Sequence, residues 1–273
     1  MTIKLINIVF DLGILYLIYL LSNKNVQKTF IYAINPVTLL ITTLHGQFDV
    51  IPVFFILFSI YLLNKKRDFS SILSLSLAIA LKTWPLLFFI PIFRNLKNKK
   101  IIVLVAIFPI FFVLIYSFLF KSSLIDISKT IIHYQGLWGI WGPWSWIGKI
   151  RMIIQKTATM LFLISFFGYS LINTTKNTVK NIYLLLFFFF TFTTNFSIQY
   201  FTWLVPFLIL IKPKNFLYLI IFISIYLFSF YYAWLFCLGC KTIPFWLTLT
   251  QNTIGFILWL SFIRIWCISK KIS

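Results

Sequence analysis

The sequence predicts an all-α fold: a polytopic transmembrane helix bundle that forms a single integral membrane domain over residues 1–273. Of the residues, 61% are hydrophobic and only 10% are charged, and the apolar residues come in long runs. A helix pairs its own backbone groups in hydrocarbon, and the runs lack the alternation of a barrel strand. We therefore expect roughly nine to eleven helical pieces, one of them broken and re-entrant.

The net charge of +20 would suggest nucleic acid as a partner in a soluble protein. Here, however, most cations lie in six short clusters between the apolar runs. The clusters are Lys24 with Lys28, Lys65 to Arg67, Arg94 to Lys100, Lys176 with Lys180, Lys212 with Lys214, and Lys270 with Lys271. This distribution follows the positive-inside rule. It predicts no nucleic-acid partner and a multi-pass protein of the cell membrane, with all six clusters and the C-terminus in the cytoplasm.

The first two stretches give the direction of the chain. The run Leu5–Leu21 ends at a cytoplasmic cluster, so its beginning is expected outside. The stretch Phe30 to Leu63 begins and ends at clusters, so it must cross outward and return. Its polar apex, His45 to Asp49, is therefore expected on the extracytoplasmic side.

The stretch Ser71 to Phe93 also lies between two clusters, yet it is long enough for only one full crossing. Lys82-Thr83-Trp84-Pro85 stands at its middle, and proline removes a helix hydrogen bond and disfavours helical geometry in the residue before it. We expect two half-helices that form a re-entrant hairpin, whose bend lines an enclosed cavity.

The rest of the chain alternates between crossings and turns. The expected helices are Ile101–Phe120, Ile153–Ile172, Asn181–Thr193, Phe196–Ile211, Phe216–Cys237 and Ile254–Ile268. Lys121 to Arg151 is expected to be the main external loop, and Thr193 to Asn195 an external apex.

Asp49, with His45 and Gln47, forms the densest polar group at membrane depth. An ionisable residue there is a functional candidate because its desolvation is costly, whereas at a water interface the charge costs little. Asp49 could accept a hydroxyl proton, order a sugar or hold a divalent cation. Lys82 needs a partner at mid-run, which could be a ligand phosphate, a carbonyl or an acid.

Two aromatic segments are further candidates. His133 and Tyr134 precede a tryptophan-rich part of the external loop, which could be an interfacial belt or a surface that stacks on sugars. Gln199 and Tyr200, followed by Trp203, could bind substrate or cap the apex of the later hairpin. No Walker loop, GxGxxG, HExxH or GxSxG motif is present in the sequence.

Five phrases occur in an order that resembles a known group of enzymes. They are Asn35-Pro36, then His45-Gly46-Gln47-Phe48-Asp49, then Ala80-Leu81-Lys82-Thr83-Trp84-Pro85, then Tyr134-Gln135-Gly136 with Trp141-Gly142, then Gln199-Tyr200-Phe201-Thr202-Trp203-Leu204-Val205-Pro206. Together they resemble the GT-C superfamily of polytopic glycosyltransferases, particularly its bacterial and archaeal mannosyltransferase-like branch. The resemblance spans roughly residues 5 to 206.

This resemblance implies transfer of a hexose, such as mannose, from a polyprenyl-phosphate sugar to a lipid-linked, glycan or protein acceptor on the extracytoplasmic side. It implies that Lys82 lies near the lipid phosphate, that His45, Gln47 and Asp49 line the site, and that the aromatic loop covers it. Family members usually begin with a helix and an external loop that bears the catalytic Asp, whereas this chain opens at what resembles the third helix. We expect a truncated chain, a separate polypeptide that supplies the missing helices, or a loss of activity.

The mechanism expected is direct displacement at the anomeric carbon. A carboxylate, either Asp49 or one upstream of Met1, accepts the hydroxyl proton, while Lys82 or a bound metal stabilises the departing phosphate. The alternatives are a lipid or small-molecule transporter or flippase, which also uses broken helices, and a non-catalytic membrane scaffold.

Overall fold

The computed structural model describes residues 2–133, 137–138, 141–147, 150–173, 175–236 and 244–271. Helices make up 84% of it, and its short sheet has two strands, so the all-α prediction is confirmed. The longer helices are α1 (Thr2–Leu21), α2 (Val26–Ala33), α4 (Val50–Asn64), α5 (Asp68–Leu81), α7 (Leu104–Phe120), α8 (Leu124–His133), α9 (Ile150–Ile172), α10 (Thr178–Phe192), α11 (Phe201–Ile211), α12 (Phe216–Phe236) and α13 (Phe245–Lys271). The short elements are α3 (Pro36–Thr38), α6 (Phe89–Arg94), β1 (Leu137–Trp138), β2 (Asn195–Phe196), the π-helical η1 (Leu39–His45) and the 3₁₀ turns η2 (Trp84–Phe88), η3 (Lys99–Val103), η4 (Gly142–Ser145) and η5 (Ile198–Tyr200).

Four helical segments in the described part of the chain are long and apolar enough to cross a membrane. They are Lys4–Leu21, Lys99–Phe120, Phe216–Leu235 and Phe245–Lys270. Shorter apolar helices, among them α4, α5, α10 and α11, lie between them. The protein is therefore a membrane protein with several crossings, as the composition predicts.

The outward limb of the first hairpin is broken into α2, α3 and η1, whereas the sequence predicts one crossing. Pro36 disfavours helical geometry at Asn35, and the Asn35 side chain accepts a hydrogen bond from the Val37 N–H at 2.9 Å. Asn35 therefore ends one helix and caps the next. The limb then ends at Gly46, whose left-handed φ of +77° favours glycine.

The predicted break near Lys82 is present. Helix α5 ends at Leu81, and η2 and α6 follow it. The Asp68 Oδ2 atom, at the beginning of α5, accepts hydrogen bonds from the backbone N–H groups of Lys97 and Asn98, at 2.8 and 2.9 Å. The segment therefore returns to the level from which it started, as a re-entrant hairpin must.

Helices α4 and α5 form the tightest pair in the molecule and carry the site. Ser71 donates to the Ser59 carbonyl oxygen at 2.9 Å, and Ser74 donates to the Phe55 carbonyl oxygen at 2.7 Å. Small hydroxylated residues let helices approach closely and hydrogen-bond across the interface within a membrane. Because the pair is antiparallel, the beginning of α4 lies beside the end of α5.

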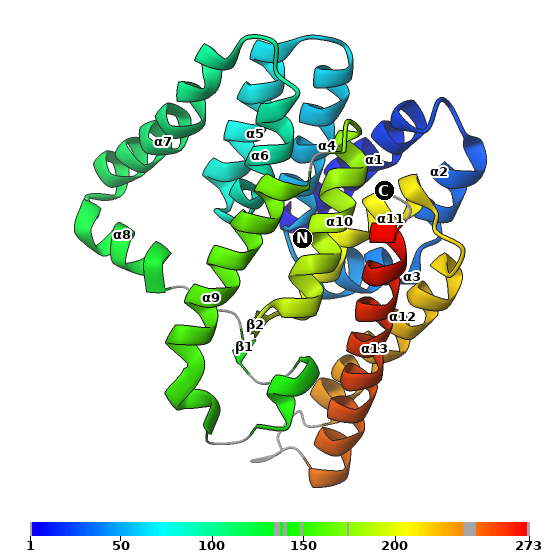
Figure 1. Ribbon diagram of the computed structural model, residues 1–273. Coiled ribbons are helices and arrows are strands. Elements are labelled where there is room, and N and C mark those ends of the chain that lie inside the picture. The colour runs from blue at the N-terminus through cyan, green and yellow to red at the C-terminus, as the bar shows by residue number, and fades with distance from the viewer. Residues whose placement is uncertain are drawn as a thin grey trace.

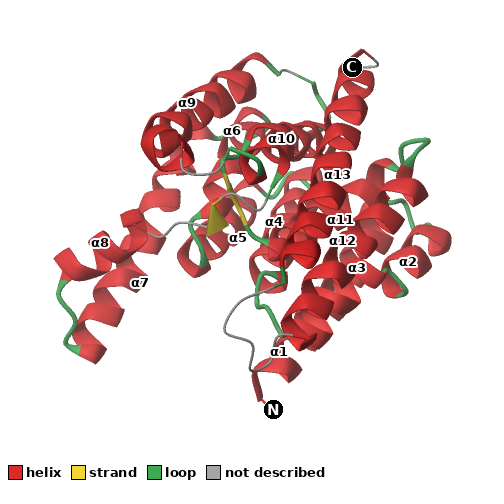
Figure 2. Cartoon of the chain, turned by 90° about the horizontal axis from the view of Figure 1, so that it is seen from below, coloured by secondary structure: helices red, strands yellow, loops and turns green. Residues whose placement is uncertain are grey.

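The external loop contains a helix that the sequence analysis did not predict. Helix α8 has apolar residues on one side, with Asp126 and Lys129 away from them, which is typical of a helix at a membrane interface. Ser123 Oγ accepts a hydrogen bond from the Ile125 N–H at its first turn. Figures 1 and 2 both show α7 and α8 at one edge of the bundle, where α7 packs against α5.

Helix α13 begins nine residues before the predicted Ile254, at Phe245. The polar side chains of this added part are satisfied locally: Thr250 Oγ1 donates to the Trp246 carbonyl oxygen, and Gln251 donates to that of Ser229. A membrane helix tolerates polar residues when they find such partners. The predicted helix was too short at its beginning because the prediction used only the run of apolar residues.

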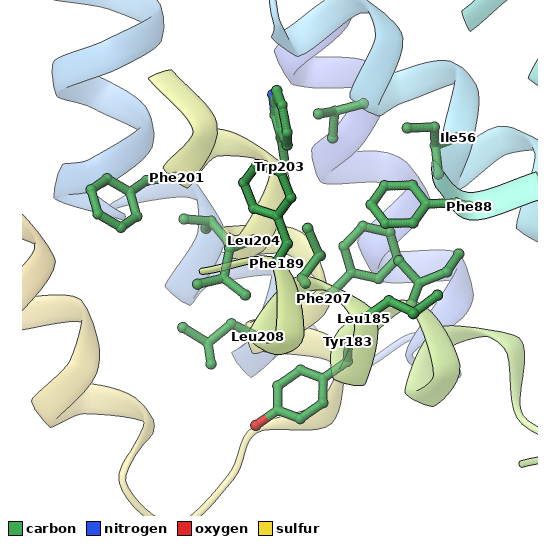
Figure 3. Close-up of a cluster of buried hydrophobic side chains, with 14 of the residues drawn as sticks. Ile56, Phe88, Tyr183, Leu185, Phe189, Phe201, Trp203, Leu204, Phe207 and Leu208 are labelled. Atoms are coloured by element: carbon green, nitrogen blue, oxygen red, sulfur yellow. The ribbon is translucent and has the colours of Figure 1, made fainter. Parts of the chain in front are cut away.

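Aromatic side chains fill the core around α10 and α11 (Figure 3). Trp141 is 1% exposed, donates from Nε1 to the Phe190 carbonyl oxygen at 2.7 Å, and stacks on Phe196 with ring centroids 4.4 Å apart. Each such aromatic pair contributes about 0.5–1.5 kcal/mol beyond its area. Trp141 is thus a core residue.

Loops that are far apart in the sequence contact one another at both ends of the helices. Strand β1 pairs with β2, which joins the external loop to the apex near Thr194. At the other ends of the helices, Lys212 Nζ donates to Gln27, and Arg94 donates to the Asn173 carbonyl oxygen at 2.7 Å. The basic turns therefore contact one another, while the polar apexes contact one another.

Candidate active site

Three predicted segments meet at Asp49, which is fully buried. Its Oδ2 atom lies 2.7 Å from Lys82 Nζ, and its Oδ1 atom accepts a hydrogen bond from Trp203 Nε1 at 3.0 Å. Among the described residues, this is the one salt bridge between an acidic and a basic side chain. Helices α4, α5 and α11, widely separated in the sequence, thus supply one cluster.

Local backbone geometry turns Lys82 toward Asp49. Lys82 ends α5 with an extended backbone, φ −151° and ψ 149°, and its N–H closes the helix on the Ala78 carbonyl oxygen. Pro85 at the start of η2 prevents the helix from continuing. The side chain therefore leaves the helix end sideways, where the antiparallel packing of α4 has placed Asp49.

The ammonium group of Lys82 lies between the carboxylate and an aromatic ring. Lys82 Nζ is 4.5 Å from the centroid of the Phe48 ring, in cation–π geometry. The side chain is 18% exposed. Among the described residues it makes a hydrogen bond to Asp49 alone, so further protons of this three-proton donor can reach a ligand.

A cavity of about 680 Å³ opens beside this cluster. Lys82 and Gln199 supply polar groups to its wall, and Tyr200 and Trp203 supply aromatic ones. Asp49 is not one of the lining residues. The volume is that of a typical small-molecule site, and the bend of the broken hairpin lines this cavity, which is partly open.

Stacked rings form one wall of the cavity. Trp84 and Trp203 lie parallel, with centroids 3.9 Å apart and planes 10° apart, and Tyr200 lies 4.1 Å from Trp203. Trp203 is 3% exposed. Because Trp84 and Tyr200 pack against the Trp203 indole, the stack fixes the side chain that donates to Asp49.

The apex residues His45 and Gln47 are linked to each other. His45 Nε2 lies 3.0 Å from Gln47 Nε2, and His45 Nδ1 lies 3.2 Å from the hydroxyl of Tyr231 in α12. Gln47 lines the cavity. His45 is the last residue of η1. The fully buried Asn7 of α1 holds the turn after η1, because its Nδ2 atom donates to the Gly46 and Gln47 carbonyl oxygens.

The structure therefore brings together most of the residues predicted for the site. His45, Gln47, Asp49, Lys82, Gln199, Tyr200 and Trp203 lie in or beside the cavity wall. His133 ends α8, whose Thr130 lines the cavity one turn earlier. Tyr134 lies outside the described residues. The roles of all these residues stay predictions.

Two features bear on the catalytic residues. Asp49 is fully buried and does not line the cavity, so a role as proton acceptor would require a rearrangement that exposes one of its oxygens to the substrate. In the described part of the chain no three His, Cys, Asp or Glu side chains come together in a way that could hold a metal ion. The geometry of Asp49 thus fits a residue that positions Lys82.

Two residues that hold the apex, Asn7 and Tyr231, were not predicted from the sequence. Asn7 could have been noticed as a polar residue within the first apolar run, where an amide needs partners. Tyr231 gave no signal, because tyrosine is common in the apolar run that contains it. Its contact with His45 depends on the packing of α12 against α3.

Comparison with known proteins gives one match. No curated protein and no solved structure matches the chain. The model of glycosyltransferase family 87, a GT-C-type membrane family, matches residues 5–146, which is a little more than half of the chain. The matched part contains Asp49 and Lys82, the ion pair beside the cavity. The chain is therefore a membrane protein that belongs to glycosyltransferase family 87.

Proposed function

We propose that this glycosyltransferase transfers a hexose, with mannose as the first candidate, from a polyprenyl-phosphate sugar to an extracytoplasmic acceptor. The acceptor is lipid-linked, a glycan or a protein, and the site faces the outside of the cell membrane. Family membership makes transfer the favoured class over transport or scaffolding. The observation that carries the proposal is a cavity with a lysine at one end and an apolar groove at the other.

The apolar end suits a prenyl chain. A second hollow of about 340 Å³ shares Ala80 and Val113 with the main cavity and continues along α7 past Phe112 and Leu119. Only 6% of the span that contains α7 is buried. A lipid chain lying in this groove would therefore remain in contact with the surrounding membrane.

The polar end suits the phosphate and the sugar. The Lys82 ammonium can donate to a phosphate oxygen while it keeps its contact with Asp49. An acceptor hydroxyl oxygen then attacks the anomeric carbon, the bond from that carbon to the phosphate oxygen breaks, and polyprenyl phosphate leaves. Lys82 stabilises the charge that grows on the leaving phosphate, which is where preorganised donors accelerate a reaction most.

The proton of the acceptor hydroxyl must pass to a base. Asp49 remains a candidate, provided that substrate binding brings one of its buried oxygens into contact with the hydroxyl group. A positioned general base contributes about 10²–10⁴-fold to a rate. Asp49→Asn keeps the shape of the side chain and removes its basicity, so the size of its effect on the rate separates the base from a residue that only positions Lys82.

The experiment is transfer from radiolabelled polyprenyl-phosphate mannose to endogenous acceptors in membranes that contain the chain. We expect Lys82→Met to lower transfer strongly and the matched variant Lys214→Met, on an exposed turn among the basic clusters, to leave it unchanged. Equal transfer by the wild type and Lys82→Met would refute the role of the lysine. Absence of transfer with mannose, glucose and galactose donors alike would refute the proposed donor class.

A further inference from the structure

Gln47 presents its two amide atoms to different surroundings. Its Nε2 atom is engaged by His45 Nε2 at 3.0 Å, while its side chain forms part of the cavity wall. Among the described residues, no hydrogen bond reaches Gln47 Oε1. Asn7 holds the backbone beneath it through the Gly46 and Gln47 carbonyl oxygens. The contact with His45 therefore decides which amide atom of Gln47 faces the cavity.

The contacts of His45 determine which amide atom faces the cavity. An amide nitrogen can only donate, so His45 Nε2 must accept, and a neutral imidazole then carries its proton on Nδ1. That proton is donated to the Tyr231 hydroxyl oxygen, 3.2 Å away.

We infer that Tyr231 and His45 are positioning residues that hold the Gln47 carboxamide oxygen toward the cavity, where it accepts a hydrogen bond from a substrate hydroxyl. The inference rests on the proposed function for the identity of that substrate. Lys82, which lines the same cavity, can only donate, so an amide oxygen from Gln47 adds an acceptor that complements it. A sugar, which offers several hydroxyl protons, is the chemical class that such an acceptor selects.

The chain of hydrogen bonds from Tyr231 through His45 to Gln47 has a reversed form that an experiment can detect. If the amide turned over, its oxygen would accept from His45 Nε2–H, and Nδ1 would accept from Tyr231, so the cavity would face an amide donor. The two forms place the histidine proton on different nitrogens. The histidine tautomer therefore reports which amide atom the site presents.

Nitrogen-15 NMR of the full chain in lipid bilayers, with labelled histidine, measures this tautomer at neutral pH. The chain has two histidines, and the signal lost in His45→Gln identifies the relevant one. We expect a protonated Nδ1 and an unprotonated Nε2. Tyr231→Phe should shift the proton toward Nε2, whereas Tyr218→Phe, on an exposed part of α12, should not. A proton on Nε2 in the wild-type protein would overturn the inference.

Transfer kinetics test the substrate hydroxyl. Loss of one hydrogen bond in Gln47→Met should lower kcat/KM about tenfold, and Tyr231→Phe should cause a smaller loss in the same parameter. A raised KM for the donor lipid would place the hydroxyl on the donor sugar, and a lowered kcat with donor KM unchanged would place it on the acceptor. Unchanged kinetics in Gln47→Met would refute the contact. The tautomer needs no turnover, so failure of the proposed function and failure of this inference are separable.

Discussion

The ion pair between Asp49 and Lys82 should make the two residues strongly interdependent for stability. Lys82→Met leaves the Asp49 carboxylate, which is 0% exposed, with only the Trp203 N–H as a partner. Breaking a buried pair from one side costs about 3–5 kcal/mol, because a buried charge remains uncompensated. We therefore expect Lys82→Met to lower the free energy of unfolding by about that amount.

The opposite change should cost less. Asp49→Asn keeps an oxygen that can accept from Trp203, and the Lys82 side chain, 18% exposed, can turn its ammonium into the cavity. A loss of about 1–3 kcal/mol is expected. In the double variant Asp49→Asn with Lys82→Met no charge is left unpaired, so the double variant should be more stable than Lys82→Met alone.

The measurement is equilibrium unfolding in mixed detergent micelles, followed by the fluorescence of the ten tryptophans. The four proteins of the cycle are compared with Lys214→Met, which removes an exposed lysine of the same length. We expect a coupling energy of about 2–3 kcal/mol between the two sites. Coupling below about 0.5 kcal/mol, the range of independent sites, would refute the view that the pair is a buried and mutually dependent unit.

Three further substitutions test other contacts. Trp203→Phe removes the N–H that reaches the buried carboxylate and should lower the free energy of unfolding by about 1–3 kcal/mol in the same assay; an unchanged value would contradict the hydrogen bond. Gly142→Ala should lower the thermal midpoint, because its φ is +56° and a Cβ atom would lie 2.8 Å from Trp259 Cδ1; a raised midpoint would contradict the packing. Arg94→Ala should speed hydrogen exchange in the last turn of α9, whose carbonyl oxygens the guanidinium binds, while exchange in α12 stays unchanged; equal exchange in both helices would refute this cap.

The helices were predictable where a single property decides them. Long apolar runs must be helical in hydrocarbon, so the starts of α1 and α7 were predicted to within three residues and the start of α12 correctly. The break after α5 was predictable from Pro85, which cannot continue the helix. The additional break at Asn35 was visible as an Asn-Pro step, but the apolar residues on both sides of it concealed a helix end.

The partners within the site were harder to predict because they depend on packing. Lys82 was expected to need a partner, and Asp49 was expected to be functional, yet nothing in either local sequence joins them. Their positions, almost equally far from the turn at Lys65 to Arg67, are the signal that was available: in an antiparallel helix pair such residues lie at the same level. Trp203 and Tyr231 come from later helices, and only the assembled bundle places them.

The hydrogen bond from Trp203 to Asp49 joins residues that are 154 positions apart, and this separation has a consequence for biosynthesis. At a synthesis rate of about 5–20 residues per second, roughly 8 to 30 s pass between the appearance of the carboxylate and that of the indole. The nascent protein must hold Asp49 and Lys82 in the membrane during that interval with only each other as partners. Tyr200 and Trp203 are synthesised long after Asp49 and Lys82, so the aromatic stack is complete only once α11 has been inserted. Partly synthesised chains should therefore be unable to bind a substrate there.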